Sequence, residues 1–150
     1  MTAVSSDILL VEDSPDDALL IQRAFRQARI ASPIRVVTDG DQAVAYLAGS
    51  PPFADRALHP APILMLLDLK LPRRSGLEVL AWLRRESPLK RLPVVVLTSS
   101  RESGDVNRAY DLGCNSYLVK PVAFDALLDM IRTINHYWVL LNEKPELPQA

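Results

Sequence analysis

Five polar side chains each stand directly after an apolar run of this chain. They are Glu12 and Asp13 after ILLV, Asp68 after ILMLL, Thr98 after VVVL, and Lys120 after YLV. A lone aspartate at such a place is common for local reasons, because its carboxylate bonds the backbone of turns. Five such groups gathered at one place could bind ligands, because acids bind cations and because a hydroxyl and an ammonium group bind anions.

The elements that would position these groups are five short strands that alternate with helices. The apolar runs are residues 8–11, 34–37, 63–67, 94–97 and 117–119, and helices are expected at about 15–29, 40–48, 76–86 and 103–112. Apolar strands separated by helices predict an α/β fold with a parallel sheet covered on both faces. Right-handed crossovers favour the flavodoxin-like, doubly wound order 2-1-3-4-5.

That strand order makes the first and third strands neighbours, so Glu12, Asp13 and Asp68 should converge at the carboxyl edge of the sheet. Three carboxylates repel one another without a cation, and a hard divalent ion, Mg²⁺ or Mn²⁺, suits oxygen ligands. Thr98 offers a hydroxyl donor and Lys120 a positive charge for a phosphate. The arrangement predicts transfer of a phosphoryl group to Asp68, which attacks in line.

These residues, with DLKLPRRSG around Asp68, resemble the receiver domain of response regulators in two-component signalling. The resemblance implies that Asp68 is the phosphoacceptor and that a sensor histidine kinase presents a phosphohistidine to it. It also implies that Asp13 binds Mg²⁺ directly, that Glu12 acts through water, and that the backbone carbonyl of Lys70 is a further ligand. The protein would then be a phosphoacceptor rather than an enzyme with a turnover of its own.

The same resemblance assigns roles around the edge of this site. Thr98 would be the switch hydroxyl, Tyr117 an aromatic that swings inward on activation, and Lys120 the cationic partner of the phosphoryl group. The Lys120-Pro121 peptide bond would be cis. Kinase recognition would fall on the last loop and on the first helix, with four candidate contact residues there: Asp17, Leu20, Arg23 and Ala24.

The final helix is expected over about residues 122–142, longer than a short sheet needs, with a tail at 143–150. Its apolar residues recur in steps of three and four, which is typical of a helix with one buried face. Beyond the sheet, this stripe predicts a surface that binds a protein partner. The predicted interface residues are Ile134, Tyr137, Trp138 and Leu141.

Three segments are similar to single-domain regulators that pair with bacterial and cyanobacterial phytochrome kinases. They are VEDSPDDALL, the proline-rich loop 51–62 and HYWVLLNEKP. The resemblance implies a bacteriophytochrome partner and a homodimer formed by the final helix region.

Composition excludes several other classes. A chain of 150 residues fits one receiver domain, 1–150, without an output domain. A net charge of −1 indicates no nucleic-acid partner. The absence of a signal peptide or a long apolar run indicates no membrane span, and the single cysteine, Cys114, is compatible with the cytoplasm.

Three alternatives remain. A haloacid-dehalogenase-type phosphohydrolase would also use a strand-end aspartate, but it would carry an acid where this chain has Lys70. A nucleotide- or flavin-binding module would need a glycine-rich loop where EDSPDD stands. The third is a binding scaffold that works without phosphorylation.

Overall fold

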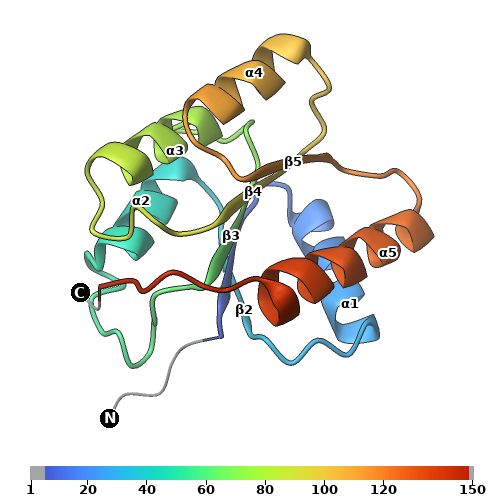
Figure 1. The fold of residues 1–150 in the computed structure, drawn as a ribbon, viewed down its shortest axis with the longest axis horizontal. Helices are drawn as coiled ribbons and strands as arrows, with labels where there is room; N and C mark the ends of the chain where they lie inside the picture. Colours follow the sequence, from blue (N-terminus) through green and yellow to red (C-terminus); the bar gives the residue numbers. More distant parts are fainter. Residues whose placement is uncertain (1–5, 149–150) are drawn as a thin grey trace.

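A five-stranded parallel sheet with helices on both faces forms the centre of the molecule (Figure 1). The computed structural model describes residues 6–148. The strand order is β2-β1-β3-β4-β5, so the flavodoxin-like topology predicted from the sequence is confirmed. The strands are β1 (Ile8–Val11), β2 (Ile34–Val37), β3 (Leu64–Leu67), β4 (Val94–Thr98) and β5 (Ser116–Val119).

Helices α1 and α5 cover one face of the sheet, and α2 and α3 cover the other, with α4 beside α3 (Figure 1). Successive residues of β1, β3 and β4 point to opposite faces, which is why these strands are apolar throughout. In α4, Ala109 is the buried residue, which agrees with its weak apolar stripe. The helices are α1 (Pro15–Gln27), α2 (Gly40–Ala48), α3 (Gly76–Arg85), α4 (Ser103–Asp111) and α5 (Phe124–Ile134).

Side-chain caps fix where the helices near the carboxyl edge begin. The Ser14 hydroxyl accepts the backbone N–H of Asp17 at 3.3 Å, so α1 starts directly after the Glu12-Asp13 pair. Ser75 and Glu78 form a reciprocal capping box at the start of α3. Gly49 ends α2 with φ +69°, a left-handed conformation that glycine adopts readily.

The final helix differs from the expected continuous α-helix over 122–142. Its α-helical part ends at Ile134, and a π-helix, η1 (Asn135–Leu141), follows, closed by an N–H donated from Asn142 to the Tyr137 carbonyl at 2.7 Å. Trp138 and Val139, adjacent in sequence, both pack against the core of the α1/α5 face. Apolar spacing shows which side of a helix is buried, but it does not distinguish an α-turn from the rarer, wider π-turn.

Two segments cover the amino edge of the sheet. The chain after η1 crosses from the α5 side toward α2, where Leu147 packs on the α2/α3 core and the Glu146 carbonyl accepts a hydrogen bond from Arg91 at 3.3 Å (Figure 1). In the proline-rich loop, Phe53 and the half-buried His59 pack edge-on or tilted against Tyr46. No helix in the described residues is long and apolar enough to cross a membrane.

Candidate functional site

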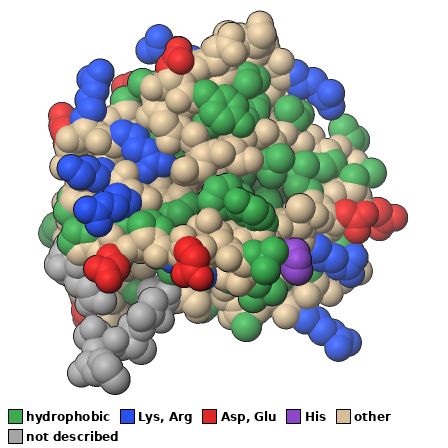
Figure 2. Space-filling view, in the orientation of Figure 1, with side chains coloured by type: hydrophobic (Ala, Val, Ile, Leu, Met, Phe, Trp, Pro, Cys, Tyr) green, Lys and Arg blue, Asp and Glu red, His purple; other side chains and the backbone are tan. Residues whose placement is uncertain are grey.

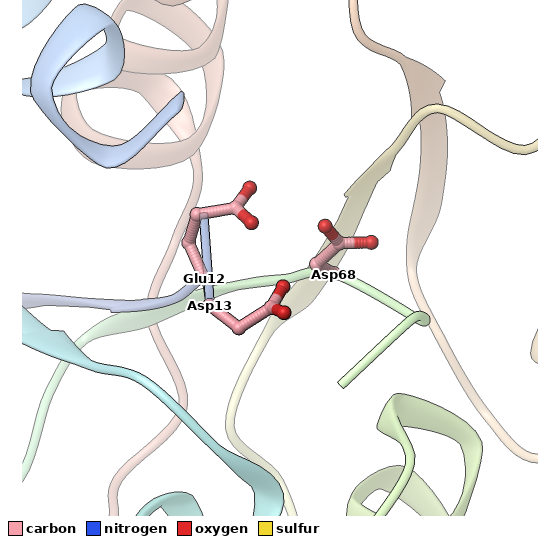
Figure 3. A group of neighbouring side chains, drawn as sticks. All are labelled: Glu12, Asp13 and Asp68. Carbon is pink, nitrogen blue, oxygen red and sulfur yellow. The ribbon is translucent and has the colours of Figure 1, made fainter. Parts of the chain in front are cut away.

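Three acidic side chains meet where β1 and β3 end. The carboxylates of Glu12, Asp13 and Asp68 point into one space, and one oxygen from each lies within 4.8 Å of the others (Figure 3). Glu12 is 1% exposed and Asp68 6%, whereas Asp13 is exposed. The convergence predicted from the strand order is therefore present, and two of the three acids are buried.

Lys120, directly after β5, is the cation of this cluster. Its Nζ lies 2.8 Å from Asp68 Oδ2, forms an ion pair with Glu12 Oε1, and lies 3.0 Å from Asp17 Oδ2. The Lys120 side chain is 11% exposed. Lys120 thus donates hydrogen bonds to Asp68 and Asp17 and forms an ion pair with Glu12, in a largely buried setting where each charge needs a partner.

The second oxygen of Asp68 is held from the other side. Thr98, fully buried at the end of β4, donates its hydroxyl to Asp68 Oδ1 at 2.8 Å. The backbone N–H of Lys70 donates to the same oxygen at 3.2 Å. Gly76 lets α3 approach this loop, because a Cβ there would stand 2.2 Å from the Asp68 carbonyl oxygen. The Asp68 carboxylate is thus held by the Thr98 hydroxyl, the Lys70 backbone N–H and the Lys120 ammonium group.

The shared charges shift the pKa values of the cluster. Burial raises the pKa of Glu12 from 4.5 to about 7, although Lys120 opposes the shift. Burial would also raise the pKa of Asp68, but hydrogen bonds from Lys120 and Thr98 outweigh it and lower that pKa below its ordinary value. Burial would lower the pKa of Lys120, but its bonds to Asp68, Glu12 and Asp17 raise it. Asp68 is therefore an ionised carboxylate, as a nucleophile must be.

The donor set fits a divalent cation. The cluster has an excess of carboxylates over its single ammonium group, and among residues 6–148 no side chain bonds that of Asp13. Exposed, unpartnered carboxylate oxygens beside a buried pair are the ligands that hard divalent ions take. The acidic cluster can therefore hold such an ion at its open side.

Tyr117 on β5 points toward the loop between β4 and α4. Its hydroxyl donates to the Ser100 carbonyl at 2.9 Å, and the ring packs half-buried on the α2/α3 core. The Ser100 hydroxyl donates in turn to Asp105 Oδ2 of α4 at 2.5 Å. A hydrogen-bonded chain thus connects β5, the loop after Thr98 and α4.

Two residues that were predicted to contact partners are buried in the protein's own core. Of the kinase-contact candidates, Ala24 is 0% exposed because α1 packs this side on the sheet. Ile134 of the predicted dimer interface is 2% exposed, since the chain's own α1/α5 core covers it. The prediction of a cis Lys120-Pro121 bond is wrong. Among residues 6–148 the one cis bond is Pro51-Pro52. The Lys120-Pro121 bond has the trans form, which is lower in energy even before proline.

The contact between Asp17 and Lys120 escaped the sequence reasoning, which placed Asp17 on a kinase-facing surface. The available signal was its position in the first turn of the helix that follows Glu12-Asp13.

Comparison with known proteins agrees with this geometry. Residues 8–132 match the family model described as the response regulator receiver domain. The chain belongs to the receiver domain family. A receiver acts as a phosphoacceptor, and this fold and family do not favour the haloacid-dehalogenase reading, since Lys70 stands where that class needs an acid.

Two relatives match this chain over most of their own length. Response regulator Rcp1 of Synechocystis sp. is 39% identical over 143 residues, 95% of this chain and 93% of Rcp1. The probable methanogenesis regulatory protein FilR2 of Methanothrix harundinacea is 40% identical over 138 residues, 92% of this chain and 86% of FilR2.

Two solved structures bear on the site. The phosphorylated cyanobacterial phytochrome response regulator RcpA superimposes with a TM-score of 0.87 at 36% identity, covering 95% of this chain and 100% of RcpA. The Mn²⁺-bound form of Rcp1 superimposes with a TM-score of 0.84 at 38% identity, covering 94% and 99%. A phosphorylated and a metal-bound receiver thus share this fold.

Proposed function

We propose that Asp68 accepts a phosphoryl group from the phosphohistidine of a sensor histidine kinase. The observation that carries the proposal is the setting of the Asp68 carboxylate, with Thr98 on one oxygen and Lys120 on the other. In the transfer the phosphorus–nitrogen bond to histidine breaks and a phosphorus–oxygen bond to Asp68 forms. The freed imidazole nitrogen keeps the electron pair.

The same donors serve the product. Phosphorylation spreads the negative charge of Asp68 over the phosphoryl oxygens, so the Thr98 hydroxyl and the Lys120 ammonium group follow the charge outward. Neither group needs to be brought from a distance, because both already lie within 2.8 Å of the carboxylate. Transfer therefore needs little rearrangement of the fold.

The cation is proposed to be Mg²⁺, bound directly by Asp13 and Asp68, by Glu12 through water, and by the backbone carbonyl of Lys70. When bound, it neutralises charge on the phosphoryl oxygens during transfer. The exposed side of the cluster at Asp13 supports this assignment, because Mg²⁺ keeps several waters and loses them reluctantly. Mn²⁺ in the Rcp1 structure supports an ion of this class.

The switch is proposed to run from Thr98 to Tyr117. Movement of the Thr98 hydroxyl toward a phosphoryl oxygen would pull on the following loop, whose Ser100 carbonyl accepts the Tyr117 hydroxyl. Because Ser100 also bonds Asp105, the change would reach α4, the α-helix with the fewest buried residues. A loosely packed helix is suited to move.

The kinase is proposed to be a bacteriophytochrome, and this protein is proposed to act in the cytoplasm. The likeness to RcpA, a phytochrome response regulator, supports this choice. Docking would use α1, where Leu20 is 41% exposed and Arg23 is exposed, next to the Lys120 loop. The whole chain, 1–150, would act as one domain.

A homodimer through the final helix is proposed as well. Tyr137, Leu140 and Leu141 are 52%, 65% and 62% exposed, and apolar side chains lie open on the face that carries this helix (Figure 2). Trp138 stacks edge-on against Tyr137 with ring centres 4.9 Å apart and would border the interface. Exposed aromatic and leucine side chains of this kind favour a protein partner.

The test of the phosphoacceptor role is labelling by acetyl phosphate with Mg²⁺, read on a Phos-tag gel. The parent protein should gain one phosphoryl group, and Asp68→Asn should gain none. Asp16→Asn, an exposed acid on α1, is the matched control and should label like the parent. Equal labelling of Asp68→Asn and the parent would refute the assignment.

A further inference from the structure

The Lys120 ammonium group donates hydrogen bonds to two carboxylates and forms an ion pair with a third. Asp68 Oδ2 lies at 2.8 Å, Asp17 Oδ2 at 3.0 Å, and Glu12 Oε1 completes the set as an ion pair. An ammonium group has no fourth donor. An incoming phosphoryl oxygen must therefore compete with these carboxylates for the Lys120 ammonium group.

Asp17 is the carboxylate that can leave most readily. Its side chain is 39% exposed, against 1% for Glu12 and 7% for Asp68. Water can take the place of Lys120 at Asp17, whereas a buried carboxylate that loses its cation stays unpaired. Asp17 also belongs to the first turn of α1, outside the strand ends that carry the other two acids.

We propose that Asp17 is a positioning residue that holds Lys120 in the unphosphorylated state and thereby slows phosphoryl transfer to Asp68. Its negative charge also repels the negatively charged phosphoryl group. The two groups compete, in addition, for the same ammonium group. Asp17 thus limits how fast small phosphodonors can phosphorylate the protein. This inference rests on the proposed phosphoacceptor role of Asp68.

The experiment compares initial rates of phosphorylation by acetyl phosphate in saturating Mg²⁺, with far-UV circular dichroism and thermal unfolding as checks of the fold. Asp17→Asn keeps the shape of the side chain and removes its charge. It should be phosphorylated about threefold to fivefold faster than the parent, the range expected for a partly exposed ion pair. Asp17→Glu restores a carboxylate and should return the rate to within about twofold of the parent value.

Asp16→Asn is the matched control. Asp16 lies in the same first turn and is exposed, so its loss changes the net charge and the helix dipole interaction as Asp17→Asn does, without touching Lys120. Its rate should stay near that of the parent. A parent-like or slower rate in Asp17→Asn, or an equal acceleration in Asp16→Asn, would overturn the inference. Failure of the parent itself to label would instead overturn the phosphoacceptor role, and with it this inference.

Discussion

The carboxyl edge of the sheet and the end of the final helix show opposite arrangements. At the edge, Glu12 and Asp68 are acidic groups with almost no exposed surface, and each lies against Lys120. At the helix end, Leu140 and Leu141 are apolar groups that stand mostly in solvent. The carboxyl edge buries acidic groups that water would solvate, whereas the helix end exposes apolar groups that water would exclude.

The difference shows what fixes each region. A buried charge needs a specific partner at hydrogen-bond distance, so the edge has one arrangement that the fold must keep. An exposed leucine has no such requirement and is free to meet another molecule. We therefore propose phosphoryl chemistry at the edge and association of two copies at the helix end, and changes in the two regions should have different consequences.

Removal of the buried cation should have the largest effect. Lys120→Met in EDTA should lower the free energy of unfolding by about 3–5 kcal/mol, because Glu12 and Asp68 would remain buried without a cation beside them. Urea denaturation measures this loss, and added Mg²⁺ should recover part of it. Lys70→Met, at an exposed lysine, should stay within about 0.5 kcal/mol of the parent. Equal free energies of unfolding for Lys120→Met and Lys70→Met would contradict the expected difference between a buried and an exposed lysine.

The raised pKa of Glu12 predicts a pH dependence of the metal-free protein. Folded Glu12 keeps its proton up to about pH 7, whereas in the unfolded chain it releases it near 4.5. The stabilisation is complete below the lower value and is lost as pH rises through the higher one, by at most about 3 kcal/mol. Asp68, with a lowered pKa, has the opposite sign and acts at lower pH.

Urea unfolding of the parent and Glu12→Gln at several pH values, in EDTA, measures this dependence. The parent should lose stability relative to Glu12→Gln as pH rises from about 5 to 8. A constant difference between the two proteins across this range would show that Glu12 is ionised throughout.

At the helix end, Trp138 should have a moderate effect on stability. It is half-buried against the α1/α5 core, so Trp138→Ala should lower the free energy of unfolding by about 1–2 kcal/mol, less than at a fully buried tryptophan. Thermal or urea unfolding at a protein concentration that keeps the chain monomeric measures the change. An unaltered stability would mean that η1 is not packed on the core.

Leu140 should have the smallest effect on folding and a clear effect on association. At 65% exposure, Leu140→Glu should change the free energy of unfolding by less than about 0.5 kcal/mol and shift sedimentation toward the monomer. Thr133→Glu adds the same charge at an exposed position of α5 and should leave association unchanged. Identical sedimentation of Leu140→Glu and the parent would remove the helix end as an interface.

The two regions also differ in how far the sequence predicted them. Glu12, Asp68, Thr98 and Lys120 could be brought together in advance, because each follows an apolar strand and parallel strands end at one edge. The bond between Asp17 and Lys120 could not, since it depends on how far a lysine reaches toward a neighbouring helix.

In the helices, periodicity identified apolar stripes but not what covers them. Ala24 and Ile134 were assigned to partner surfaces, yet the chain's own core buries both. The change from α5 to η1 left no trace in the apolar spacing, because π-turns and α-turns can carry the same stripe.

The most direct test of the account is to locate the phosphoryl group on the chain. Protein labelled with acetyl phosphate and Mg²⁺ is treated with borohydride, which reduces an aspartyl phosphate to homoserine, and the peptides are sequenced by mass spectrometry. The account predicts homoserine at position 68 alone. Homoserine at position 13 or 17 in place of position 68 would contradict it.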